Sequence, residues 1–126
     1  MKLETDNWND MVWVPDREGV KRVVFASSSD KISCGIGEYS VGHALHPHCH
    51  PNEQMSVCLK GKCDYYVDSK PYAMVPGSWI TIPPDVSHFI YVHDTDETCI
   101  VMDISSPSRP DRDSEYRKAV EKLKNC

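Results

Sequence analysis

The sequence predicts an all-β protein, a sandwich or barrel of short antiparallel strands, that ends in one α-helix. Runs rich in Val, Ile, Tyr and Phe recur along most of the chain, turn signals separate them, and an apolar period of helical spacing begins only near the end. A chain of 126 residues suffices for one domain that buries roughly two-thirds of the surface exposed on unfolding. We therefore expect a single domain, with an N-terminal arm over residues 1–19, a barrel over about 20–105, and a C-terminal loop and helix over 106–126.

The candidate strands are brief and are bounded by Gly, Pro, Asp and Ser. They span residues 21–26, 31–39, 54–59, 64–67, 79–82, 88–93 and 98–104. The nine prolines fall almost entirely in the gaps, as expected because proline cannot donate a hydrogen bond to a central ladder.

The last segment has the apolar stripe of an amphipathic helix. Its members fall at i, i+3, i+4 and i+7: Tyr116, Ala119, Val120 and Leu123. Ser114 is the predicted N-cap, and lysines near the end suit the helix dipole. We expect this helix to pack on its own barrel rather than on a partner, whereas residues 8–15, with two tryptophans, could form a covering arm or a dimer contact.

Composition excludes several classes of function. A net charge of −5 and a pI near 5.6 disfavour binding to nucleic acid or to an anionic membrane. The first residues lack the apolar core of a signal peptide, and no apolar run approaches the ~20 residues that span a bilayer. We expect a cytoplasmic protein with reduced cysteines, including Cys58 and Cys63 on either side of a predicted turn.

Histidine is concentrated in one short segment. His43, His46, His48 and His50 fall within eight residues, and His88 follows much later. Neutral imidazole is the commonest protein ligand for metals, so this pattern predicts a metal site that folding assembles. Residues two apart on a strand point the same way, which would let His48 and His50 bind one ion at ~2.0–2.1 Å.

The third ligand must come from a neighbouring position, and Glu53 and Gln54 are the candidates, of which alternation allows only one to face inward. His88, at the start of another strand, supplies the fourth.

The spacing of these residues resembles the cupin superfamily. Its first motif reads Gly, five residues, His-x-His, three or four residues, Glu or Gln, six residues, Gly, and the chain matches it at Gly42, His48, His50, Gln54 and Gly61. The resemblance implies a double-stranded β-helix, or jelly-roll barrel, with a metal bound by His48, His50, Gln54 and His88.

The second cupin motif reads Gly, five residues, Pro-x-Gly, two residues, His. Gly77, Pro83 and His88 match it, with Asp85 in place of the second glycine. Asp tolerates positive φ better than most residues, so we expect the turn to be kept.

In a second register His46 and His48 would bind the metal together with Glu53. Gly42 and Gly61 then no longer stand at the spacings of the motif, so we favour Gln54. On the favoured register Glu53 faces away, and His46 is a pocket residue or spare ligand. His43 is then expected in a surface loop and His93 in solvent.

The alternative without a metal is that these residues merely pack inside the barrel. Each buried polar group left unpaired would then cost ~1–3 kcal/mol, which favours a bound ion.

Three imidazoles and one amide are all neutral, so a divalent ion would keep its full charge there and attract anionic oxygens. Oxygen-activating iron often uses two His and a carboxylate, and Gln54 lacks that charge, which favours isomerase or lyase chemistry over a dioxygenase. Mixed N/O ligation admits one divalent transition metal ion among Zn, Ni, Fe, Mn and Cu.

The segment after the last strand resembles the small single-domain cupins of pectin degradation, which open 4,5-unsaturated uronate rings. Their tail reads Asp-x-Phe-Ser-Pro-x-Arg, and Asp103, Ser106, Pro107 and Arg109 match it, whereas Ser105 replaces the phenylalanine. The resemblance implies that Asp103 and Arg109 are catalytic.

As hypotheses, Arg109 would clamp a substrate carboxylate and Asp103 would move a proton next to a carbonyl. The alternative for this pair is an exposed ion pair. Tyr39, Tyr66 and Tyr91 could line the pocket or belong to the core.

These observations lead to a metal-dependent enzyme that opens or isomerises a small carboxylated, sugar-derived substrate. The alternatives are a non-haem dioxygenase of the same fold and a non-catalytic barrel that binds a small molecule. Exposed sheet edges need covering, so we expect a homodimer.

Overall fold

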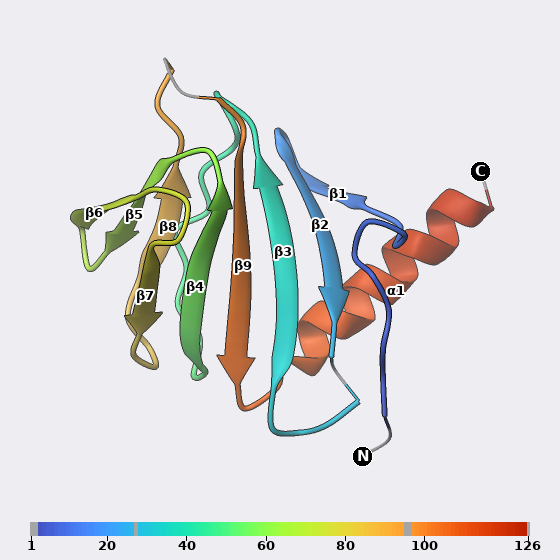
Figure 1. Ribbon diagram of the computed structural model, residues 1–126. Helices are drawn as coiled ribbons and strands as arrows, with labels where there is room; N and C mark the ends of the chain where they lie inside the picture. Colours follow the sequence, from blue (N-terminus) through green and yellow to red (C-terminus); the bar gives the residue numbers. More distant parts are fainter. Residues whose placement is uncertain (1–2, 27, 95–96, 126) are drawn as a thin grey trace.

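The computed structural model describes residues 3–26, 28–94 and 97–125, which form two antiparallel sheets and one helix (Figure 1). The elements, in chain order, are β1 (Val14–Arg17), β2 (Val20–Phe25), β3 (Ser33–Tyr39), β4 (Glu53–Lys60), β5 (Cys63–Val67), β6 (Lys70–Met74), β7 (Trp79–Ile82), β8 (His88–Tyr91), β9 (Cys99–Ser106) and α1 (Pro110–Lys124).

The two sheets face each other in a jelly-roll arrangement. One has the strand order β1-β2-β3-β9-β4-β7 and the other β6-β5-β8. The apolar core lies between them and includes Cys58, Tyr65, Ile82 and Val101. The predicted all-β fold with a C-terminal helix is confirmed.

Two strands of the structure were not predicted from the sequence. Each contains a proline and lies at the edge of its sheet. β1 lies within the segment expected to be an arm and includes Pro15, and β6 includes Pro71 in what was expected to be a turn. An edge strand has one side without a partner, so a missing N–H there breaks no ladder.

The helix α1 begins earlier than predicted. Pro110 occupies its first turn, Arg109 is the N-cap residue, and no side chain caps it, so the prediction of Ser114 as N-cap was wrong. The fixed φ of proline suits the first helical position, which moves the N-cap five residues upstream, from Ser114 to Arg109.

The helix packs on the chain's own β1 and β2, as expected. The N-terminal segment lies against the same region, because the Tyr116 hydroxyl donates to the Val12 carbonyl at 2.7 Å and Trp8 stacks on Phe25. Of the two roles considered for residues 8–15, these contacts support the covering arm.

Cys58 and Cys63 are buried thiols without a disulfide, as expected. Among the residues that the structure describes, no helix is long and apolar enough to cross a membrane.

Candidate functional site

Histidines 48 and 50 lie in the connection between β3 and β4, not on a regular strand as the sequence analysis assumed. Pro47 and Pro51 flank them, and two missing N–H groups prevent a continuous ladder. A single β-bridge replaces it: the His48 N–H donates to the His88 carbonyl at 3.2 Å and the His88 N–H donates to the His48 carbonyl at 2.9 Å. This bridge brings the two parts of the predicted site together.

The turn before β8 supports the same contact. Asp85 has a φ of +65° and its N–H donates to the His50 carbonyl at 2.8 Å. The expectation that aspartate replaces the motif's second glycine without loss of the turn is confirmed, since Asp tolerates this left-handed conformation.

His48, His50 and His88 gather into one cluster whose candidate ligand atoms lie within 4.8 Å of one another. Each ring places Nδ1 near a backbone carbonyl two residues away: His46 O at 2.6 Å, Asn52 O at 3.1 Å and Val86 O at 2.9 Å, respectively. A carbonyl can only accept, so each Nδ1 carries the proton and donates it. The Nε2 atom of each ring then keeps its lone pair, which is the form that binds a metal.

The remaining predicted ligand, Gln54, faces inward from β4 and is only 4% exposed, whereas Glu53 points outward into solvent. This burial pattern agrees with the favoured register.

A hydrogen-bond network fixes the Gln54 amide. The Ser56 hydroxyl donates its one proton to Asp103 at 2.7 Å, so it accepts from Gln54 Nε2 at 3.0 Å. Gln54 Nε2 also donates to the Tyr65 hydroxyl at 2.9 Å, which leaves Gln54 Oε1 aimed into the cluster, 2.9 Å from His50 Nε2.

Two lone pairs therefore face each other across the Gln54–His50 contact. Neither Oε1 nor the unprotonated Nε2 can donate, so this contact is unfavourable until a cation lies between the two atoms. His88 Nε2 is buried and has no hydrogen-bond partner among the described residues. A buried polar atom without a partner is costly, and a metal ion satisfies it. The chemistry of these four side chains fits a divalent transition metal.

Burial keeps the His48 and His88 rings uncharged. It lowers the pKa of His48 to about 3, with the charge that His88 would carry as a further cause. Burial also lowers the pKa of His88. Both rings are neutral near pH 7 and do not need to lose a proton to bind a metal.

The remaining histidines lie outside the cluster. His43 is buried against Tyr39, so its expected position in an exposed surface loop was wrong. The reason is the close approach of Gly19, where a Cβ would meet His43 Cα at 2.7 Å. His46 stacks on His48 and lines the adjoining cavity, and the half-exposed His93 binds Asp64 at 2.6 Å.

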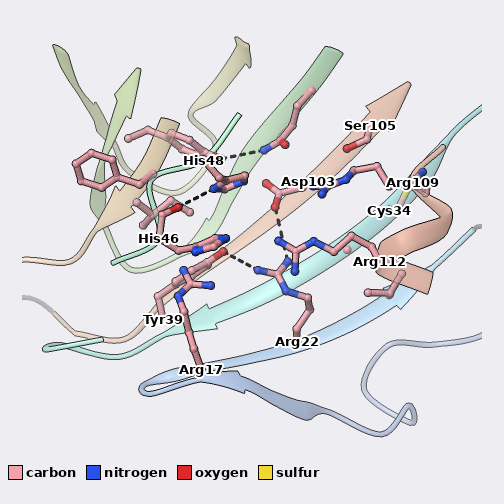
Figure 2. Close-up of a pocket in the computed structure, with 17 residues that line it drawn as sticks. Arg17, Arg22, Cys34, Tyr39, His46, His48, Asp103, Ser105, Arg109 and Arg112 are labelled. Atoms are coloured by element: carbon pink, nitrogen blue, oxygen red, sulfur yellow. Dashed lines mark hydrogen bonds and ion pairs between the residues drawn. The ribbon is translucent and has the colours of Figure 1, made fainter. Parts of the chain in front are cut away.

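Asp103 and Arg109, the predicted catalytic residues, line a cavity of about 50 Å³ that also reaches His48 and Gln54 (Figure 2). Asp103 accepts from Ser56, and Arg22 lies 3.9 Å from its other oxygen. Arg109 binds Asp111 at 3.0 Å. The ion pair of Arg109 is therefore with Asp111 and not with Asp103, as the alternative had supposed, and the mostly buried Arg109 side chain also lines the cavity.

Sequence reasoning missed three arginines in this cavity: Arg17, Arg22 and Arg112. A signal existed for one of them, because alternation along β2 places Arg22 on the same buried face as Val20 and Val24. It also missed Tyr65, which faces the site, whereas Tyr66 and Tyr91 do not line the cavity. Tyr39 does line it and is buried.

Comparison with known proteins identifies the class that this fold and cluster define. The family model of the cupin domain matches residues 35–105, more than half of the chain, so the protein belongs to the cupin family. No curated protein matches the sequence.

Solved structures share the fold at low sequence identity. KdgF from Halomonas sp. is 20% identical, with a TM-score of 0.74 over 82% of this chain and 93% of its own. An RmlC-like cupin from Shewanella frigidimarina is 22% identical, with a TM-score of 0.74 over 87% and 96% of the two chains. The polyketide cyclase RemF from Streptomyces resistomycificus is 18% identical, with a TM-score of 0.71 over 86% and 82%.

Proposed function

We propose that this cupin is a metal-dependent enzyme that opens or isomerises the ring of a small carboxylated sugar derivative, such as an unsaturated uronate. The observation that carries the proposal is the convergence of three Nε2 lone pairs and the Gln54 oxygen beside a cavity lined by Asp103 and several arginines. A cluster suited to a cation and an anion-binding cavity together fit a substrate with a carboxylate near the reacting atoms.

His48, His50, His88 and Gln54 would hold the ion. When bound, a divalent metal with neutral ligands supplies a Lewis acid that polarises substrate oxygens.

Asp103 would move the proton. It lies on β9 at the cavity, and the Ser56 hydroxyl fixes one of its oxygens at 2.7 Å, which leaves the other oxygen turned toward Arg22. A carboxylate held in this way is suited to take up or release a proton at a carbon next to a carbonyl. The arginines that line the cavity would bind the substrate carboxylate.

The tail motif and the ligand set favour this reaction over oxygen chemistry. Asp103, Ser106, Pro107 and Arg109 match the uronate-opening cupins, and KdgF from Halomonas sp. is among the fold neighbours. Gln54 supplies an amide where an oxygen-activating iron site often has a carboxylate.

The proposal is tested by measuring metal content and turnover on the same preparations. We expect about one divalent ion per chain by elemental mass spectrometry. We also expect conversion of 4,5-unsaturated galacturonate to a linear keto sugar, followed by ultraviolet absorbance and NMR. Asp103→Asn should keep the ion but lose turnover by about 10²–10⁴-fold, because the proton carrier is gone.

The neighbouring pair on β4 gives a matched control. Gln54→Ala should weaken metal binding, whereas Glu53→Ala, whose side chain is exposed, should not. Unchanged turnover in Asp103→Asn would remove Asp103 from the mechanism, and oxygen uptake that requires Fe(II) would show the dioxygenase instead.

A further inference from the structure

Four arginines reach the cavity from different parts of the chain: Arg17 at the end of β1, Arg22 on β2, Arg109 before α1, and Arg112 in its first turn (Figure 2). Asp103 is the only carboxylate among the described residues that line the cavity. The cavity wall therefore carries an excess of positive charge before any metal is added.

The four arginines differ in how well they are already neutralised. Arg17 binds Asp16 at 2.9 Å and Arg109 binds Asp111 at 3.0 Å, which are hydrogen-bonding distances. Each of these two guanidinium groups thus has a carboxylate at hydrogen-bonding distance.

Arg22 and Arg112 have no such partner in the part of the chain that the structure describes. The carboxylate oxygens nearest to Arg22 lie at 3.6 Å in Asp16 and 3.9 Å in Asp103, and the one nearest to Arg112 lies at 3.7 Å in Asp16. All three distances exceed the range of a good hydrogen bond. One acid, Asp16, is thus shared loosely between both arginines while it binds Arg17 closely.

Arg22 is also deeply buried. It is 8% exposed, its NH2 group donates to the Tyr39 hydroxyl at 3.2 Å, and its Nε has no hydrogen-bond partner among the described residues. Taking a guanidinium out of water is costly unless hydrogen-bonded anions compensate. The side chain of Arg112 is also mostly buried, and the pKa of Arg112 is lowered by burial and then by the nearby charge of Arg22. Two mostly buried guanidinium groups that share one carboxylate loosely are suited to bind a further anion.

We propose that Arg22 and Arg112 form the subsite that binds the carboxylate of the substrate, rather than Arg109, which Asp111 already neutralises. Guanidinium groups present parallel N–H donors that match the two oxygens of a carboxylate. The cavity of about 50 Å³ is several times the ~10–15 Å³ that one water needs, so it can accept such a group. The inference rests on the proposed function only in taking the anion to be a sugar carboxylate.

Binding and turnover measured separately test the subsite. Galacturonate, a saturated uronate, serves as the binding probe in calorimetry with the metal-loaded protein, and galactose, which lacks the carboxylate, serves as the neutral comparison. We expect galacturonate to bind and galactose to bind at least about tenfold more weakly. Arg112→Gln should weaken galacturonate binding at least about tenfold and leave metal content unchanged.

The same helix offers a matched control. Arg117, whose side chain is 69% exposed and binds Asp113, lies five residues further along α1, so Arg117→Gln should bind galacturonate as the wild type does. Arg112→Lys should recover only part of the affinity, because lysine cannot form the fork. Both Arg112 variants avoid removing the buried Arg22, and circular dichroism confirms that they fold.

The outcomes separate the two proposals. Arg112-dependent binding of galacturonate without turnover of the unsaturated uronate supports the subsite and overturns the proposed function. The protein could instead turn over the unsaturated uronate with a KM that is unchanged in Arg112→Gln but raised in Arg109→Gln. That result overturns the subsite and supports the proposed function. Inorganic phosphate that binds more tightly than galacturonate through Arg112 overturns the carboxylate assignment, and a wild-type protein that binds neither anion overturns the subsite.

Discussion

Ser56 connects the two halves of the site through one hydroxyl group. It is fully buried on β4, donates to Asp103 and accepts from Gln54. The same contact that orients the amide toward the cluster therefore orients the proposed proton carrier. Outer hydrogen bonds of this kind set the direction of a ligand and tune its affinity for the metal.

Ser56→Ala should therefore weaken both folding and metal binding. The Gln54 amide and Asp103 each lose a partner, so the free energy of unfolding should fall by about 1–3 kcal/mol and metal affinity by about 10–100-fold. Urea denaturation and metal titration measure the two effects. Ser78→Ala is the control, because the Ser78 hydroxyl accepts from the Val75 N–H at the surface and should cost under about 1 kcal/mol. Equal effects of the two substitutions would contradict the role of Ser56.

At the scale of elements, the hairpin between β4 and β5 depends on one glycine. Gly61 has a φ of +70°, and a Cβ there would collide with the Thr98 carbonyl oxygen and lie 3.0 Å from Cys99 Cα. The chain reversal after β4 is thus packed directly against the backbone at the start of β9. A positive φ is tolerated by glycine, but here the missing side chain matters as well.

Gly61→Ala should be more destabilising than its conformation alone requires. The left-handed φ costs about 1 kcal/mol, and the backbone collision should bring the loss to about 3 kcal/mol or more. Gly42→Ala isolates the first effect, since Gly42 has a φ of +78° but a Cβ there would meet nothing within 4 Å. Thermal denaturation of both variants compares them, and a loss in Gly61→Ala no larger than in Gly42→Ala would show that the close approach is unimportant.

At the scale of the whole molecule, the cluster joins parts of the chain that fold into different sheets. His48 and His50 come from the connection before β4, Gln54 from the larger sheet and His88 from the smaller one. An ion bound by all four cross-links the two faces of the jelly roll, so its binding energy adds to the stability of the fold.

Metal removal should therefore lower the Tm of the protein. At a metal concentration 100 times the Kd, bound ion adds about 2.7 kcal/mol, which corresponds to a shift on the order of 10 °C for a domain of this size. Scanning calorimetry after chelation and after readdition of Zn²⁺ measures it. His88→Ala should abolish the shift, and an equal shift in that variant would place the stabilising ion elsewhere.

The motif residues of the site could be predicted from sequence because short spacing determines their relation. His48, His50 and Gln54 lie within seven positions. Alternation along the strand allowed only one of Glu53 and Gln54 to face inward, and the spacing of the cupin motif favoured Gln54. The edge strands β1 and β6 could not be predicted in this way. Pro15 and Pro71 argue against a strand unless it is known that the strand lies at an edge, which is a property of the sheet.

The sequence by itself determined an all-β sandwich or barrel, because strand periodicity is local, and the motif spacing that resembles the cupins added the jelly-roll class and the four side chains of the candidate metal centre. Only the tertiary structure decided the arginine cavity. Arg22 on β2 and Arg112 on α1 are far apart in sequence, and they share Asp16 only because the helix packs back on the first two strands. Charges that meet through such packing leave no spacing in the sequence to identify them, since long-range contacts depend on how whole elements dock.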